Sequence, residues 1–402
     1  MAPRDTLGWQ RGAETTATPS RNTPGNPITV QKGVAMKSQV CFTGIFLIAS
    51  IANAGEPIPF DSPRWEITAE EHRIEEYQGK TALYLKGGLA LVKDAKFTDG
   101  VIEYWCAIPE TRGFAGASWR VQDGLNREEF YIRAHQSGNP DANQYSPIFN
   151  GMSAWQLYHG EGYGAPVEYE FDTWFPVRIV VSGDQAEVFI GDLEVPALFI
   201  DDLKREKASG AVGLNVANFG PARFADFSYE AIDTPELRGR VERERKAPEG
   251  AVMRWQVSAA FGEKDVHDVM ELVPGLTEGR TWTALETEST GLANLSRVNP
   301  VTREANTVFA MVVVVSEKVQ AKTIEFGYSD RLRLFINGKL VYAGDNGYRT
   351  RDYRYLGTIG YFDAVTVPLQ KGKNEVLFAV SESFGGWGVQ AAIPERDGIT
   401  VE

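Results

Sequence analysis

The sequence predicts an all-β protein in which a short charged linker joins a β-sandwich to a second β-sandwich or jelly roll. Short apolar or alternating runs recur along residues 80–230 and again along 253–382, with Gly, Asp and Pro between them. This is the spacing of strands rather than of helices. A charge-rich segment, residues 232–250, separates the two stretches and has a proline near each end. Only residues 263–272 show a helical hydrophobic period.

The first stretch contains eight runs that we expect to be strands. They are residues 82–85, 100–107, 114–121, 129–134, 177–181, 186–190, 211–215 and 223–229. Within residues 100–107, alternation places Ile102, Tyr104 and Cys106 on one face. Cys106 is therefore expected to be a thiol of the core rather than a reactive one.

The second stretch predicts eight more strands. They are residues 253–258, 281–285, 306–316, 321–326, 331–336, 340–342, 364–368 and 375–382. Asn337-Gly338 predicts a type I′ hairpin turn, because that turn needs positive φ at both central residues. The run 308–315 is apolar on both faces, so we expect a central strand covered on both sides.

The segment from Met36 to Ala54 has the pattern of a secretory signal peptide. Lys37 precedes an apolar run that is shorter than the roughly 20 residues of a membrane span, and Ala52 and Ala54 are small residues that suit a signal peptidase. An uncleaved N-terminal anchor is the alternative. We expect residues 1–35 to be untranslated or disordered, residues 36–54 to be removed, and the mature protein to be periplasmic or extracellular.

The charge of the chain excludes some partners. The net charge is −13, and loss of residues 1–54 makes it −16, because five basic and two acidic residues leave with them. Nucleic acids and anionic membranes need clustered cations. We therefore expect no nucleic-acid partner, and no membrane partner after signal cleavage.

Three segments resemble the concanavalin A-like lectin/glucanase superfamily, and more narrowly its laminin-G-like and 3-keto-disaccharide-hydrolase-type secreted branch. They are residues 114–120 (FAGASWR), 129–141 (EFYIRAHQSGNPD) and 144–151 (QYSPIFNG). The resemblance implies a concanavalin A-like sandwich over residues 55–231, followed by the linker 232–250. Residues 326–330 (FGYSD) and 334–340 (LFINGKL) are similar to galactose-binding-like jelly rolls, which implies that fold for residues 251–402.

The sequence departs from the catalytic pattern of this superfamily. Laminarinase-type relatives carry Glu-x-Asp-x-x-Glu on one strand. Here Glu170 and Asp172 fit that pattern, but Phe175 stands where the second glutamate belongs. A retaining glycosidase needs two carboxyl groups about 5 Å apart, so the motif does not predict that mechanism here.

Polar and aromatic residues are concentrated between positions 119 and 159. Aromatic rings hold the apolar faces of sugars, and amides and arginines bind their hydroxyl groups. In the strand 129–134, Glu129, Tyr131 and Arg133 point away from the core, as the concave face of a sugar site requires. The candidate ligand-binding residues are Trp119, Arg120, Tyr131, Arg133, His135, Gln144, Tyr145, Asn150, Trp155 and His159. The alternative is that Trp119 and Trp155 belong to the core and the rest to a solvated sheet face.

These observations predict a secreted or periplasmic carbohydrate-binding protein whose partner is an oligo- or polysaccharide. Two alternatives stay open: a glycan hydrolase or lyase of the 3-keto-glycoside type that uses carboxylates and His135, and a module that recognises a protein or cell-surface polymer. Whether the protein is an enzyme stays undecided, and no catalytic residue is assigned. No cofactor or metal is expected, although Asp123, Asn126 and Glu128 form either an oxygen-ligand set for calcium or an ordinary Asp-Gly turn.

Overall fold

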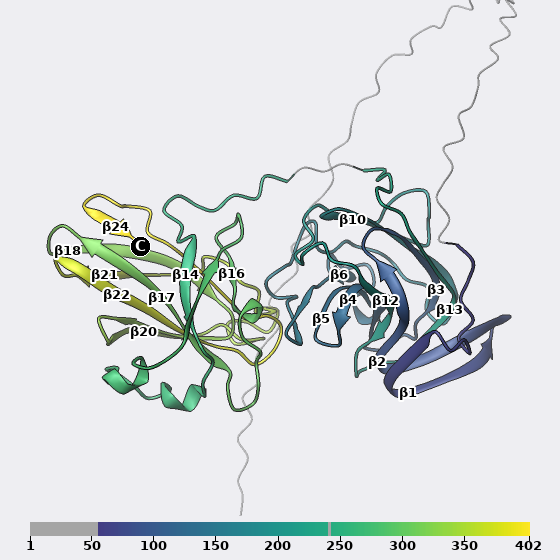
Figure 1. Cartoon of the computed structure of the whole chain (residues 1–402), viewed down its shortest axis with the longest axis horizontal. Helices are drawn as coiled ribbons and strands as arrows, with labels where there is room; N and C mark the ends of the chain where they lie inside the picture. Colours follow the sequence, from purple (N-terminus) through teal and green to yellow (C-terminus); the bar gives the residue numbers. More distant parts are fainter. Residues whose placement is uncertain (1–54, 240–242) are drawn as a thin grey trace, which may run out of the picture. The chain divides into compact units, whose positions relative to one another are not determined.

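The computed structural model describes residues 55–239 and 243–402 (Figure 1). These described residues belong to one compact unit. One sheet comes from residues 65–231 and two sheets come from residues 254–401. The predicted signal peptide and the residues before it lie outside the described part of the chain, and the division into domains at residues 232–250 remains a prediction.

The first sheet winds through thirteen strands within the described residues. They are β1 (Trp65–Tyr77), β2 (Lys80–Phe97), β3 (Gly100–Ala107), β4 (Phe114–Asp123), β5 (Asn126–Arg133), β6 (Asn143–Tyr145), β7 (Ile148–Phe149), β8 (Met152–Ser153), β9 (Phe175–Ser182), β10 (Gln185–Ile190), β11 (Leu198–Ile200), β12 (Gly210–Val216) and β13 (Ala222–Ala231). Its main path runs β11-β10-β9-β3-β13-β2-β12-β4-β5-β7-β8. Half of the neighbouring pairs in this path are distant in sequence, among them β9-β3, β2-β12 and β12-β4.

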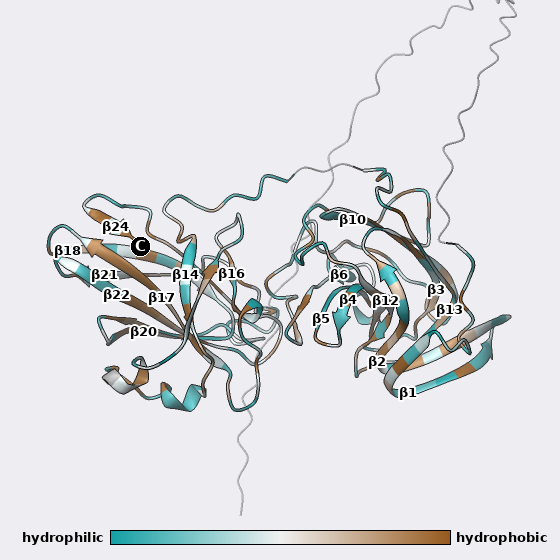
Figure 2. Cartoon of the chain, in the orientation of Figure 1, coloured by the Kyte–Doolittle hydropathy of each residue, from teal (hydrophilic) through white to brown (hydrophobic). Residues whose placement is uncertain are grey.

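The sheet curls so that its strands enclose one hydrophobic core. Leu83 of β2, Phe130 of β5 and Ile179 of β9 all contribute to this core. Cys106 lies in it as predicted, and burial raises the pKa of its thiol. Strand β1 lies off the main path of the sheet and pairs with β2 in a long hairpin. The residues of β1 are largely polar (Figure 2).

The remaining strands form a seven-stranded and a four-stranded sheet among the described residues. They are β14 (Arg254–Ser258), β15 (Trp282–Glu286), β16 (Ala293–Asn294), β17 (Thr307–Ser316), β18 (Gln320–Tyr328), β19 (Arg331–Ile336), β20 (Lys339–Asp345), β21 (Asp363–Leu369), β22 (Gly372–Ser381), β23 (Gly388–Ala392) and β24 (Ile399–Val401). As predicted, β17 lies inside its sheet, between β14 and β22, and is largely hydrophobic (Figure 2). Val308 packs in the larger core and Phe309 in a smaller one on the opposite face.

Two local predictions have different outcomes. The Asn337-Gly338 turn joins β19 to β20 with φ of 49° and 81°, so the hairpin is confirmed. The helix expected over residues 263–272 is wrong, because only a short 3-10 turn, Glu263–Asp265, forms there. Val266 and its neighbours instead cover one face of β17, so tertiary burial rather than helix formation explains their hydrophobic spacing.

The charged segment after β13 contacts the first sandwich. Arg245 donates hydrogen bonds to the Tyr163 hydroxyl (2.6 Å) and to Asp201 (2.7 Å). The amide of Arg238 donates to Glu187 (3.0 Å). In the described part of the chain, no helix is long and apolar enough to span a membrane.

Candidate functional site

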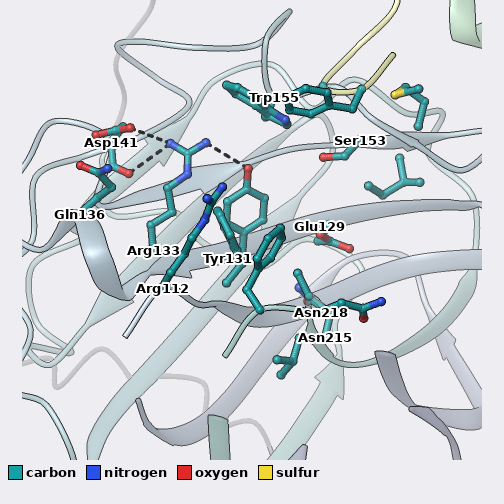
Figure 3. A pocket seen from close by; sticks show the side chains of 18 of the residues that line it. Arg112, Glu129, Tyr131, Arg133, Gln136, Asp141, Ser153, Trp155, Asn215 and Asn218 are labelled. Atoms are coloured by element: carbon teal, nitrogen blue, oxygen red, sulfur yellow. Dashed lines mark hydrogen bonds and ion pairs between the residues drawn. The ribbon is translucent and has the colours of Figure 1, made fainter. Parts of the chain in front are cut away.

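A pocket of about 740 Å³ opens over the β2, β12, β4 and β5 side of the first sandwich (Figure 3). Its lining combines aromatic, cationic, acidic and amide side chains. These are Arg112, Phe114, Arg127, Glu129, Tyr131, Arg133, His135, Gln136, Asp141, Ser153, Trp155, Asn215, Asn218 and Phe219, together with Tyr348 and Phe384 from the later part of the chain. The rest of the wall consists of Gly88, Leu89, Ile148, Gly151, Met152, Val216, Ala217, Leu356 and Gly385.

Strand β5 supplies the floor of the pocket through its alternation. Glu129, Tyr131 and Arg133 line the pocket, while Phe130 and Ile132 are buried in the core on the opposite face. Successive side chains of a strand point to opposite faces. The outward orientation expected for Tyr131 and Arg133 is therefore confirmed.

Arg133 is the best-anchored polar group of the pocket. Its Nη1 donates to Asp141 Oδ2 (3.0 Å), and its Nη2 donates to the Tyr131 hydroxyl (3.2 Å) and to Gln144 Oε1. The guanidinium also lies 5.6 Å from the ring centre of Trp155. Buried charge-assisted hydrogen bonds of this kind hold a side chain in one geometry before a ligand arrives.

Gln144 holds Arg133 and the Trp155 loop through hydrogen bonds. Its Nε2 donates to the carbonyl groups of Trp155 (2.8 Å) and Tyr158 (2.7 Å), while its Oε1 accepts from Arg133. Gln144 thus joins strand β6 to the loop that carries Trp155. It is buried and does not line the pocket, so its role is to position Arg133 and Trp155.

The acidic groups of the pocket are both paired. Arg127 donates to Glu129 Oε2 from Nε (2.9 Å) and from Nη2 (2.7 Å), and Arg133 holds Asp141. Burial raises the pKa of Tyr131, which stays a neutral phenol. Apart from Arg112, the pocket therefore offers paired ions, a phenol and amides, which suit hydroxyl-rich ligands.

Aromatic rings surround these polar groups. Phe114 lies 5.6 Å from Tyr131 and 5.4 Å from Phe219 between ring centres, and Trp155 lies 6.3 Å from Phe384. Phe219 is 56% exposed and Phe384 is 48% exposed. Both rings therefore leave apolar surface in contact with water, which is unfavourable. A ligand with apolar faces would cover them.

His135 borders the pocket beside Phe114, with 5.2 Å between ring centres. Partial burial, and then the guanidinium groups of Arg112 and Arg133, lower the pKa of His135. The imidazole is consequently neutral at pH 7 and has one donor and one acceptor nitrogen. One ring nitrogen interacts with the backbone of Gly113, so only the other can hydrogen-bond to a ligand.

The structure brings together only some of the ten predicted site residues. Tyr131, Arg133, His135 and Trp155 line the pocket, and Gln144 lies directly behind it. Asn150 and His159 lie outside it: the Asn150 amide donates to the Ser296 carbonyl (2.8 Å), and His159 Nε2 lies 3.1 Å from the Ile359 carbonyl.

The other three predicted residues are interior and need correction. Trp119 is completely buried in the core, so it has no face to offer a sugar. Tyr145 is also fully buried, and its hydroxyl donates to Glu128 (2.6 Å). Arg120 is 1% exposed and binds Asp99 (2.8 Å) in a buried ion pair. Residues 119–159 contribute to both the core and the pocket. The composition of this segment does not show which of its residues belong to which.

Several pocket residues were missed. Glu129 and Arg127 follow from the alternation that predicted Tyr131, and that signal was present in the sequence. Asn215, Asn218 and Phe219 have no such signal. They reach the pocket because β12 pairs with β4 although far from it in sequence.

The acidic motifs lie elsewhere. Glu170 and Asp172 do not line the pocket. Asp123 Oδ1 accepts hydrogen bonds from the Leu125 amide (2.7 Å) and from Asn126 (3.1 Å), as in a side-chain-stabilised turn, and Glu128 is turned inward toward Tyr145. Within the described ranges no group of three His, Cys, Asp or Glu residues could hold a metal ion.

Comparison with solved structures finds similar all-β domains. The chain is similar to carbohydrate-binding module CBM66 from Bacillus subtilis (15% identity, 42% of this chain, 96% of that chain, TM-score 0.33). It is similar to a putative glycosyl hydrolase from Parabacteroides distasonis (11%, 42% and 89%, TM-score 0.29) and to a protein of galectin-like fold from Bacillus subtilis (10%, 42% and 90%, TM-score 0.33). No protein-family model and no curated protein matches the chain. At these identities and TM-scores, the ligand must be argued from the residues of the pocket.

Proposed function

We propose that this chain is a carbohydrate-binding protein that holds an oligo- or polysaccharide in the pocket on β5. The observation that carries the proposal is the combination around Arg133. A guanidinium anchored by Asp141, Tyr131 and Gln144 lies beside the Trp155 ring. Sugars present apolar C–H faces and hydroxyl groups on the same molecule, and this site supplies both kinds of contact.

Binding is favoured over hydrolysis by the state of the carboxylates. A glycosidase of the usual kind needs one protonated carboxyl and one free carboxylate on either side of the scissile bond. Glu129 and Asp141 are each bound to an arginine, so neither is free for those roles. Assays for hydrolysis or elimination on the bound glycans test the enzyme alternative directly.

The first test is a glycan array probed with the purified chain, followed by titration of the best ligand. We expect Trp155→Ala to weaken binding by about ten-fold, because loss of a half-buried aromatic platform costs about 1–2 kcal/mol. The melting temperature should change little. Trp105→Ala is the matched control, since Trp105 is also half-buried in this sandwich but lies outside the pocket.

Three outcomes would count against the proposal. Equal affinity of Trp155→Ala and the unchanged chain would remove Trp155 from the site. An array without any bound glycan, together with capture of a protein ligand by the same pocket, would favour the interaction-module alternative. A large loss of stability in Trp155→Ala, about 3–5 kcal/mol, would assign Trp155 to the core.

A further inference from the structure

The charges of the pocket do not balance. Its lining residues include three guanidinium groups, those of Arg112, Arg127 and Arg133, but only two carboxylates, Glu129 and Asp141. Arg127 is paired with Glu129, and Arg133 with Asp141. With His135 neutral, the pocket carries one excess positive charge, although the chain as a whole carries −13.

The excess charge belongs to Arg112. Its guanidinium carbon lies 4.6 Å from the ring centre of Phe219 and 5.9 Å from that of Phe114. Among residues 55–239 and 243–402, no carboxylate or carbonyl group forms an ion pair or hydrogen bond with Arg112, and Figure 3 accordingly draws no dashed line to it. Aromatic faces orient a guanidinium but leave its edge donors free.

Arg112 is exposed and belongs to the lining of the pocket. Phe114 and Phe219, which contact it, belong to the pocket wall, and Arg112 is close enough to His135 to lower the pKa of the imidazole. A guanidinium edge matches the two oxygens of a carboxylate or of a sulfate group. The neighbouring rings match the C–H face of the sugar that carries such a group.

We infer that the pocket selects acidic saccharides, and that Arg112 binds the carboxylate or sulfate group of the sugar. This inference rests on the proposed carbohydrate function and narrows it to a substrate class. The paired arginines Arg127 and Arg133 would contact hydroxyl groups, while Arg112 would supply the recognition of charge.

The test compares three oligosaccharides by titration calorimetry with the full chain. They are an oligogalacturonate, its methyl ester, and a sulfated galactan oligosaccharide of equal length. We expect the unchanged chain to prefer at least one charged ligand over the neutral ester, with a preference that falls as salt rises. Arg112→Gln should reduce that preference by about ten-fold or more, as expected for loss of a charged hydrogen-bonding partner.

Two further variants separate charge from geometry. Arg303→Gln removes the same charge from an exposed site outside the pocket and should keep the preference. Arg112→Lys keeps the charge without the planar fork and should give an intermediate preference. Comparing the affinities for the oligogalacturonate and for the sulfated galactan shows whether the pocket binds a carboxylate or a sulfate group.

The possible results separate the inference from the proposed function. Equal binding of the charged and neutral ligands, or an unchanged preference in Arg112→Gln, overturns the inference and leaves carbohydrate binding standing. Failure of all three ligands, together with an empty glycan array, overturns both. A preference lost equally in Arg303→Gln also overturns the inference, because it would then reflect the overall charge of the chain.

Discussion

At the scale of single residues, the same chemical type serves opposite purposes in this protein. Trp119 and Trp155 lie in the same short region of sequence, but Trp119 is fully buried and Trp155 borders the pocket. Arg120 and Arg112 differ in the same way: Arg120 neutralises the buried Asp99, whereas Arg112 lies against the exposed ring of Phe219. Residue type therefore indicates the available chemistry, and only burial and partners indicate its use.

A buried carboxyl group provides a prediction at this scale. Glu382 follows β22 and is fully buried, and burial together with the neighbouring Asp330 raises the pKa of Glu382 well above its usual range. Above the unfolded pKa, near 4.5, the unfolded state has lost the proton that the folded state keeps. The free energy of unfolding should therefore fall as pH rises, by at most about 1.4 kcal/mol per pH unit for this one group.

Glu382→Gln should reduce this slope and make the protein more stable at pH 7 to 8 than the unchanged chain, because the amide has no proton to lose. Urea unfolding at several pH values measures the effect. Glu375→Gln on the exposed side of β22 is the control and should leave the slope unchanged. Identical slopes for Glu382→Gln and the unchanged chain would show that Glu382 does not titrate as described.

At the scale of elements, alternation and turn chemistry determine what each strand presents. Strand β5 buries Phe130 and Ile132 and turns Tyr131 and Arg133 to the pocket. The β19–β20 hairpin turns at Asn337-Gly338, where both residues have positive φ. These features are local, so their sequence signals are strong.

The hairpin gives a prediction with a matched control. Gly338 has φ of 81°, and an added Cβ would meet only the Leu272 carbonyl oxygen, at an ordinary 3.8 Å, so Gly338→Ala should destabilise the fold by about 1–2 kcal/mol through backbone strain alone. Gly124 has open space where a Cβ would lie, and its φ lies outside the left-handed region, so Gly124→Ala should be neutral or stabilise by up to about 1 kcal/mol. Chemical denaturation of both variants measures the difference, and equal effects would contradict the role of φ.

At the scale of the whole molecule, long-range pairing assembles the pocket. Asn215 comes from β12, Phe114 from β4 and Tyr131 from β5, and these strands are neighbours in the sheet. Tyr348 and Phe384 add aromatic surface from the later part of the chain. The chain has a net charge of −13, but the pocket is locally cationic. Both hold because the unpaired positive charge of the pocket belongs to one residue, Arg112.

Export is the prediction that concerns the whole chain, and it rests on the sequence from Met36 to Ala54. We propose that the chain is secreted and that cleavage follows Ala54. N-terminal sequencing of exported protein should begin at Gly55, and Ala54→Tyr should block cleavage because the peptidase requires a small residue there. Asn53→Tyr, at the neighbouring position, is the control and should still be cleaved. An exported chain that retains Phe46 would contradict the proposal.

The sequence by itself determined the all-β class, most strand positions, the Asn337-Gly338 turn and the two faces of β5. Each of these depends on a period of two or on the φ preference of one or two residues, which are local properties. Only the tertiary structure decided that Trp119 and Tyr145 belong to the core, that residues 263–272 pack without a helix, and that Asn215, Asn218 and Phe219 face Tyr131. These outcomes depend on which strands pair across long sequence separations, and the order β2-β12-β4-β5 leaves no local pattern in the chain.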